Sequence, residues 1–270
     1  SRTYGLINGE ASNPATSGNI AYWHDLSGQG KHGTIGSDPQ YTNDGIYFDN
    51  NDYAGTPNIG SITNYSVFVV MKPDGTPTET WEGIVGRGGR NFNMWLNNNR
   101  RIHHRYTTSS SGNTNNGPGD TPSGSISTSE FNIVNIDHNG STIRTLINGD
   151  VLASTNGNPQ ASVEGTTFIA RNLDSGNNNY FKGWISEIII LNESPSASNL
   201  LKINNYLSQK WGLSYTADSD GDGVETPEDS DDNNPNICSD NDADGCDDCS
   251  NGSYNPSNDG TDNDSDGICN

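Results

Sequence analysis

The stretch FNIVNIDHNGSTIRTLINGD, residues 131–150, decides the fold class. Its segments 131–137 and 141–147 are rich in alternating or β-branched residues, and each is followed by an Asn-Gly pair, Asn139-Gly140 and Asn148-Gly149. Both residues of such a pair tolerate positive φ, so the pair closes a tight hairpin between antiparallel strands. The stretch therefore predicts consecutive antiparallel strands.

Similar segments recur through residues 1–193, between turns rich in Gly, Asn and Pro. About ten strands at this spacing predict an all-β sandwich or barrel. A hydrophobic content of 29% and 32 glycines fit short strands joined by many turns. Residues 107–128, rich in Ser, Gly and Asn, are expected to form a long flexible or functional loop. The predicted strands are residues 19–24, 45–49, 65–72, 83–87, 92–96, 101–106, 131–137, 141–147, 166–171 and 181–191.

A single helix is predicted after the strands. Apolar residues recur at three-to-four spacing from Leu200 to Trp211, and Gly212 follows them. This spacing indicates an amphipathic helix that ends at the glycine. Hydrophobicity then falls sharply, so we expect two domains, residues 1–216 and 217–270.

The acidic side chains are concentrated in residues 218–270, here called the acidic segment. The whole chain has 34 Asp and Glu against 13 Lys and Arg, a net charge of −21, and 17 of these acids lie in the acidic segment, which has no Lys or Arg. Such a region repels nucleic acid and attracts cations. We therefore expect no nucleic-acid partner.

The aspartates of the acidic segment follow a repeated Asp-x-Asp-x-Asp-Gly pattern. Alternate residues of a tight loop turn their oxygens toward one hard cation, and the glycine allows the sharp turn, so the pattern predicts bound calcium ions. Asn251 stands at the twelfth position of the second loop, where a closing carboxylate is expected, and the third loop is expected to be incomplete. The predicted ligands are Asp218, Asp220, Asp222 and Asp229, then Asp240, Asp242, Asp244 and Asp248, then Asp262, Asp264 and Asp266.

All four cysteines, Cys238, Cys246, Cys249 and Cys269, also lie in the acidic segment. The spacing Cys246-x-x-Cys249 fits half of a zinc site, but a zinc site needs a second such pair, and the neighbours here are hard carboxylates. A disulfide framework is therefore favoured, with three pairings open. Disulfides form in oxidising compartments, so we expect a secreted or cell-surface protein.

The sequence has no run of about 18 apolar residues that could span a membrane. Its first residues do not resemble a signal peptide. We therefore expect no membrane insertion, and a monomeric fragment of a larger exported chain.

Two parts of the sequence resemble known families. Residues 218–229 and 239–249 resemble thrombospondin type 3 repeats, calcium-loop modules that in bacterial secreted proteins link a catalytic or binding module to a later domain. AYWHDLSGQGKHGT (21–34), IYFDNNDY (46–53) and FKGWISEIII (181–190) resemble concanavalin A-like, laminin G-like jelly-roll domains. These resemblances imply a two-sheet antiparallel jelly-roll sandwich with one C-terminal helix, followed by a small irregular tail stabilised by calcium and disulfides.

Basic residues are concentrated between positions 87 and 105, close to Trp81. On a strand, Arg101, His103 and Arg105 share one face. Guanidinium groups pair with carboxylate or sulfate, and an aromatic face can stack on a sugar ring, so this group predicts binding of an anionic polysaccharide. The alternative is a solvated basic strand. The predicted carbohydrate-binding residues are Arg87, Arg90, Trp95, Arg101, His103, Arg105 and Tyr106.

No catalytic pattern is complete. Jelly-roll glycoside hydrolases need two carboxylates on one strand; Glu187 and Glu193 are the nearest pair, and the Asp expected between them is missing. We therefore expect a non-catalytic carbohydrate-binding module, joined to a calcium-binding spacer in a secreted multidomain protein. The alternatives are a cell-surface adhesin domain that binds protein or surfaces, and a polysaccharide hydrolase or lyase on the same scaffold.

Overall fold

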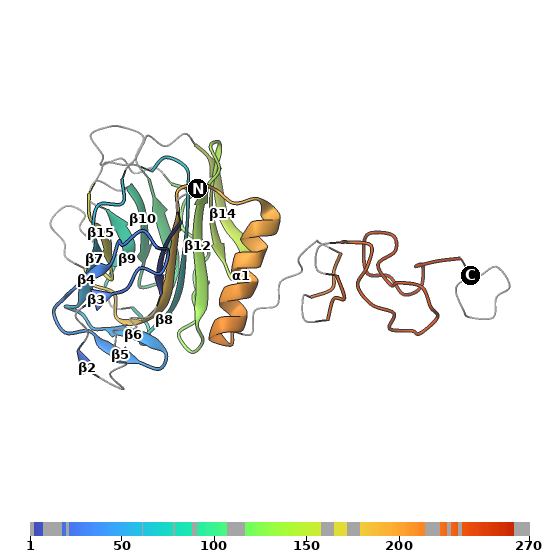
Figure 1. Ribbon diagram of the computed structural model, residues 1–270, viewed down its shortest axis with the longest axis horizontal. Helices are drawn as coiled ribbons and strands as arrows, with labels where there is room; N and C mark the ends of the chain where they lie inside the picture. The colour runs from blue at the N-terminus through green and yellow to red at the C-terminus, as the bar shows by residue number, and fades with distance from the viewer. Residues whose placement is uncertain are drawn as a thin grey trace. The chain divides into compact units, whose positions relative to one another are not determined.

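The computed structural model divides into two compact units, Ser1–Ser194 and Pro195–Asn270. The first is an antiparallel β-sandwich, and the second contains one helix and the acidic segment (Figure 1). This division falls before the helix, whereas the sequence places the boundary after it. The structure describes residues 3–7, 18–19, 22–60, 62–77, 79–87, 91–106, 117–157, 165–171, 179–213, 222–225, 228–231 and 234–261.

The larger sheet of the sandwich has nine strands, and all of its pairs are antiparallel. Strand β1 (Thr3–Ile7) pairs with β16, outside the main order. In order across the sheet, the other strands are β14 (Asp150–Asn156), β13 (Thr142–Ile147), β12 (Asn132–His138), β8 (Tyr65–Pro73), β16 (Gly183–Leu191), β6 (Gly45–Phe48), β5 (Gln40–Thr42) and β2 (Gly18–Asn19).

The smaller sheet has seven strands, and all pairs between these strands are also antiparallel. Its strand β11 forms one edge of the sheet. In order across the sheet, the strands are β11 (Ile102–Arg105), β10 (Asn91–Leu96), β9 (Glu82–Arg87), β15 (Thr167–Ile169), β7 (Tyr53–Thr56), β4 (Gly33–Gly36) and β3 (Tyr22–Trp23).

The hydrophobic core fills the space between the two sheets. Val67, Val69 and Met71 alternate along β8 and are completely buried there, as are Met94 and Leu96 on β10. A slip of one residue would turn each set out of the core and lose about 1.5–3 kcal/mol per side chain. The core therefore fixes which side chains of these strands lie on the outer faces of the sandwich.

The sequence predicted most of these strands. All ten predicted segments contain a strand, although residues 19–24 hold two short strands, β2 and β3, which belong to different sheets. Five further strands were not predicted: β1, β4, β5, β7 and β14. Glycines interrupt the expected pattern in β4 and β7, and one of them allows close packing, because a Cβ at Gly36 would lie 2.2 Å from Cζ of Tyr53. Strand β14 is mostly exposed, so it lacks a clear alternation.

The predicted hairpins and helix are confirmed. Asn148 and Gly149, with φ of 50° and 89°, form the turn between β13 and β14. Helix α1 (Ala197–Trp211) begins after Ser196, whose side chain accepts a hydrogen bond from the Asn199 N–H, and it ends at Gly212 with φ of 61°. No helix of the described ranges is long and apolar enough to cross a membrane.

The described part of the acidic segment contains no strand or helix. A disulfide joins Cys238 to Cys249, whose Cα atoms are 5.7 Å apart, and this resolves one of the pairings that the sequence left open. Cys246 is disulfide-bonded as well, and Cys269 lies outside the described residues. Because Cys249 is oxidised, it offers no thiolate for the alternative zinc site.

Candidate functional site

The predicted basic strand is β11, the edge of the seven-stranded sheet. Ile102 and His104 are completely buried and face the core, while Arg101 and Arg105 are half-buried on the outer side. His103 lies on the same outer side and is 7% exposed. The alternation predicted from the sequence is therefore present in the structure.

Two tryptophans lie beside His103. The rings of Trp95 and His103 are nearly parallel, with centroids 5.4 Å apart, and the Trp81 centroid is 4.3 Å from that of His103. Trp95 is only 5% exposed, whereas Trp81 is half-buried. Trp95 therefore packs against His103 inside the protein, whereas part of the Trp81 ring is exposed to solvent.

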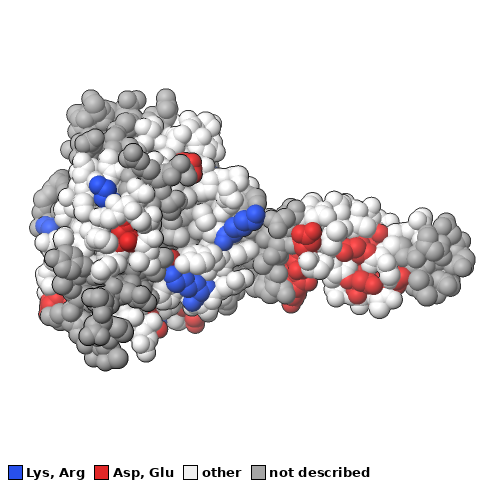
Figure 2. Space-filling view, viewed as in Figure 1, with Lys and Arg blue, Asp and Glu red and all other residues white. Residues whose placement is uncertain are grey.

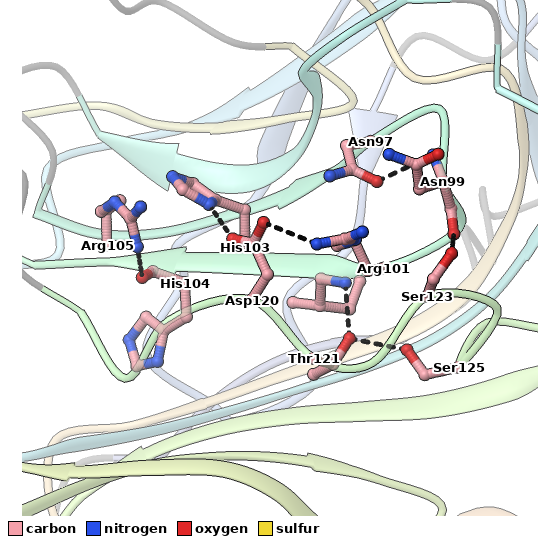
Figure 3. A network of polar contacts seen from close by, with 11 residues as sticks. Asn97, Asn99, Arg101, His103, His104, Arg105, Asp120, Thr121, Ser123 and Ser125 are labelled. Atoms are coloured by element: carbon pink, nitrogen blue, oxygen red, sulfur yellow. Dashed lines mark hydrogen bonds and ion pairs between the residues drawn. The ribbon is translucent and has the colours of Figure 1, made fainter.

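A carboxylate reaches the same place from a distant part of the sequence. Asp120 belongs to a segment that folds back along β11 (Figure 3). The Thr121 N–H donates to the Ile102 carbonyl at 3.0 Å, and the Ile102 N–H donates to Thr121 Oγ1 at 2.9 Å. One oxygen of Asp120 contacts His103 Nδ1, and the other lies 3.5 Å from Arg101 Nη1. No local pattern in the sequence points to Asp120, because the fold-back of this segment is a tertiary feature.

These contacts change the electrostatics of the site. Asp120 partly neutralises Arg101, while Arg105 donates from Nη1 to the His104 carbonyl at 3.1 Å. The site thus combines two guanidinium donors and a carboxylate acceptor beside an aromatic ring, which are the groups that bind acidic substituents and hydroxyl groups. We call it the β11 surface, formed by Trp81, Trp95, Arg101, His103, Arg105 and Asp120.

Two of the predicted carbohydrate-binding residues, Arg87 and Tyr106, are buried. Arg87 is 2% exposed, because it donates from Nε to Thr167 Oγ1 at 3.0 Å and from Nη1 to the Gly60 carbonyl at 2.7 Å. Tyr106, 5% exposed, is buried beside β11, and this burial raises its pKa. Neither side chain is accessible to a polysaccharide, so both are corrected to structural roles. Arg90 lies outside the described residues.

A second candidate site lies in the acidic segment, where the described surface is rich in Asp and Glu (Figure 2). Carboxylate oxygens of Asp240, Asp242 and Asp244 lie within 4.8 Å of one another, and those of Asp242, Asp248 and Asp259 form a second such group. Desolvation, together with repulsion from Asp244, Asp259 and Asp248, raises the pKa of Asp242. The two groups share Asp242, so the five carboxylates form one cluster, here called the aspartate cluster.

Two oxygens of the aspartate cluster are buried without a donor. Asp248 is 1% exposed and Asp259 7% exposed, and within the described residues neither Oδ1 of Asp248 nor Oδ2 of Asp259 has a hydrogen-bond partner. The other oxygen of Asp248 accepts a bond from the Asn241 N–H at 2.9 Å, which holds the carboxylate in place. Burying such an oxygen costs free energy unless a cation binds it, so these residues fit a hard metal ion.

Asp259 was not predicted as a ligand. It lies beyond Asn251, the residue at the twelfth position of the second loop, and its place in the cluster depends on the path of the chain between them. In the first predicted site, Asp222 is buried and Asp229 Oδ1 accepts the Asp231 N–H at 2.9 Å. The other predicted ligands, Asp218, Asp220, Asp262, Asp264 and Asp266, lie outside the described residues.

Comparison with known proteins identifies the family of the sandwich. The family model described as the concanavalin A-like lectin/glucanases superfamily matches residues 48–200, more than half of the chain. The chain belongs to this superfamily, as its resemblance and its two-sheet fold both indicate. No curated protein sequence matches the chain.

Several solved structures share the fold at low sequence identity. A Trypanosoma rangeli sialidase in complex with sialic acid superposes with a TM-score of 0.56 and 13% identity, over 77% of this chain and 33% of that one. A mutant of HCR/D gives a TM-score of 0.55 and 14% identity, over 76% and 50%. The chain thus spans only a third of the sialidase, and the similarity concerns the fold alone.

Proposed function

We propose that the chain is a non-catalytic carbohydrate-binding module for an anionic polysaccharide, joined to a calcium-binding spacer in a secreted multidomain protein. The observation that carries the proposal is the β11 surface, where Arg101 and Arg105 lie on the outer side of an edge strand beside the half-buried Trp81. Membership of a superfamily that contains lectins supports it. The Cys238–Cys249 disulfide supports an oxidising, extracellular location.

The chemistry of the β11 surface suits an acidic sugar. The guanidinium groups of Arg101 and Arg105 can pair with a carboxylate or sulfate group, Asp120 can accept hydrogen bonds from sugar hydroxyls, and Trp81 offers a ring face for stacking. Arg101 and Arg105 are already held by Asp120 and the His104 carbonyl. A ligand therefore orders few side chains when it binds, which favours affinity.

The carboxylates of the β11 surface favour binding over cleavage. Hydrolysis by the usual route needs two carboxyl groups that flank the glycosidic bond. Among the described residues of the β11 surface, Asp120 is the single carboxylate, and Glu187 is buried in the nine-stranded sheet. Release of reducing ends or unsaturated products from a bound polysaccharide would contradict this part of the proposal.

Arg101→Ala and Arg105→Ala test the glycan site. We expect each variant to bind alginate, carrageenan or a pectic chain about tenfold more weakly, a change of about 1.4 kcal/mol in the binding free energy. Affinity electrophoresis with and without calcium measures the effect. Lys202→Ala is the matched control, because it removes an equal charge from an exposed position of α1. Unchanged retention by both arginine variants would refute the site, and a wild-type protein that binds no glycan would favour the adhesin alternative.

The aspartate cluster supports the calcium-binding part of the proposal, through the unpaired buried oxygens of Asp248 and Asp259. We expect Asp259→Asn to weaken calcium binding to this cluster about tenfold, since ligand charge sets the affinity of such sites. Calorimetric titration of the whole chain with CaCl₂ measures this effect. Asp231→Asn, at an exposed aspartate of the same segment, is the control and should leave the affinity unchanged. Equal affinity in the two variants would remove Asp259 from the ligand set.

A further inference from the structure

A row of aromatic and basic side chains crosses the outer face of the nine-stranded sheet. Tyr47 of β6, Trp184 of β16 and Lys72 of β8 are direct neighbours across adjacent strands. The residues next to them, such as Ile185 and Met71, point into the core, so the row points outward. All three side chains are half-buried, and the Tyr47 and Trp184 ring centroids are 4.9 Å apart. With strands about 4.8 Å apart, the row is about 10 Å long, which suits a short oligosaccharide segment.

The ammonium group of Lys72 lies between two rings of this surface. Its Nζ is 4.8 Å from the ring centroids of both Trp184 and Phe131. Within the described residues, it has no hydrogen bond or ion pair with a carboxylate or carbonyl oxygen. An ammonium group has three N–H donors, and rings satisfy them only weakly. The two rings therefore fix the position of the Lys72 ammonium group, and its N–H donors remain available to an anionic ligand.

The surroundings keep this surface rigid. Tyr47 Oη donates to Asp74 Oδ2 at 2.8 Å, and Lys182 Nζ pairs with the same oxygen at 2.9 Å. The Asp74 N–H donates to the Lys182 carbonyl at 3.0 Å. Gly183 permits this close approach of β16 to β8, because a Cβ there would lie 2.3 Å from the Lys72 carbonyl oxygen. The backbone beneath the rings thus has little freedom, and ligand binding requires little rearrangement.

We infer that Tyr47, Lys72, Phe131 and Trp184, here called the Trp184 surface, form a second sugar-binding site, specific for a sugar that carries a carboxylate or sulfate group. Because the planes of Trp184 and Tyr47 are tilted by 56°, the sugar ring stacks on Trp184 while Tyr47 lines its edge, and the anionic group of the sugar pairs with Lys72. At the margin Lys182 pairs with Asp74, whose charge also interacts with Lys72, and Lys72 is the cation that lies against the two rings. The inference rests on the proposed function for its class of ligand, but its residues are separate from the β11 surface.

The competing explanation is that Lys72 is purely structural, with its aliphatic stem covering the two rings. Lys72→Met distinguishes the two, since methionine keeps the apolar cover and removes the charge. If the role is structural, Lys72→Met leaves glycan binding unchanged. If the inference is right, the variant loses affinity for acidic glycans and keeps any affinity for neutral ones.

The experiment is a calorimetric titration of the whole chain with alginate oligosaccharides, carrageenan oligosaccharides and, as a neutral control, laminarin oligosaccharides. We expect Lys72→Met and Trp184→Ala each to weaken binding of an acidic oligosaccharide at this site about tenfold. Lys72→Arg should retain it, and Lys202→Met is the control for loss of charge. The alginate and carrageenan arms distinguish a carboxylate from a sulfate ligand.

A double variant, Arg101→Ala with Arg105→Ala, separates the two sites. Loss of binding only in this double variant supports the β11 surface and overturns the inference. Loss only in Lys72→Met supports the inference and overturns the β11 surface. The wild-type protein supplies a measurement that does not depend on any variant folding: two acidic oligosaccharides per chain support both sites. No binding of either acidic oligosaccharide overturns both.

Discussion

The sandwich and the acidic segment bury opposite kinds of side chain. In the sandwich, Trp23, Phe48 and Phe181 are completely buried, as part of one large apolar cluster. In the described part of the acidic segment, the apolar cluster consists of Val224 and the disulfide pair. The acidic segment instead buries carboxylates of Asp222, Asp248 and Asp259. The sandwich therefore carries its own source of stability, whereas the acidic segment depends on a cross-link and, by our proposal, on an ion.

The sandwich and the acidic segment also differ in how a buried carboxylate is compensated. In the sandwich, the completely buried Asp137 pairs with Arg144, whose Nε donates to it at 3.1 Å. The acidic segment has no Lys or Arg, so no basic side chain within it pairs with the buried carboxylates of Asp248 and Asp259. Leaving one charge of a buried pair without its partner typically costs about 3–5 kcal/mol. On our proposal, the partner of the aspartate cluster is a calcium ion from solution.

The largest expected effect concerns the apolar core. Phe48→Ala should lower the free energy of unfolding of the sandwich by about 3–5 kcal/mol, because it leaves a cavity beside Trp23. Calcium affinity of the acidic segment should not change. Urea denaturation followed by tryptophan fluorescence measures the loss, since all five tryptophans lie outside the acidic segment. Leu26→Ala, at a side chain that is 54% exposed, should cost under about 0.5 kcal/mol. A fall in calcium affinity in Phe48→Ala would show that the two regions do not fold independently.

A somewhat smaller effect is expected from removal of the disulfide. Cys238 and Cys249 are separated by 11 residues, and a loop of this size constrains the unfolded chain by about 3 kcal/mol. Replacing both by serine should therefore lower the unfolding temperature of the acidic segment and spare the sandwich. Differential scanning calorimetry, with and without a chelator, resolves the two transitions. A single metal-independent transition would contradict the comparison.

The smallest effect is a pH dependence specific to the sandwich. Burial lowers the pKa of His104 from 6.5 to about 3, with smaller contributions from Arg105, His103 and His138. Between these values the unfolded chain binds a proton that the folded sandwich does not, so stability falls as pH falls. The slope is at most about 1.4 kcal/mol per pH unit, between pH 6.5 and 3.

Urea denaturation at pH 7.5, 6 and 5 measures this slope. His104→Gln is the control, because glutamine can still hydrogen-bond to Tyr65, the partner of His104 at 2.8 Å, but does not titrate. The variant should show a shallower slope over the same range. An equal slope in both proteins would assign the acid sensitivity to other groups.

Local features of the fold could be read from the sequence, because each depends on neighbouring residues. The Asn148-Gly149 turn, the end of α1 at Gly212 and the alternation along β11 are of this kind. Strands β4 and β7 could not be predicted from the sequence, because their glycines lack the side chains whose alternation reveals a strand. Arg87 was wrongly predicted to bind carbohydrate for a related reason. Its buried side chain donates to Thr167 of another strand, a contact that no local pattern shows.

The candidate sites divide in the same way. The carboxylates of one Asp-x-Asp-x-Asp-Gly loop follow from their spacing, and the structure brings Asp240, Asp242 and Asp244 together. Asp120 and Asp259 could not be predicted from residue spacing, because each reaches its site through the path of a connecting segment. Residues that complete a site from a distance are thus the ones that sequence patterns miss.

The segment that carries Asp120 also protects the sandwich from self-association. An edge strand with free N–H and C=O groups is a template on which copies of a protein can polymerise. Thr121 and Ile126 donate their N–H groups to the carbonyls of Ile102 and Arg100, and so cover this part of the edge at β11. Changes in this segment that uncover the edge therefore risk aggregation, which limits how freely its sequence can vary.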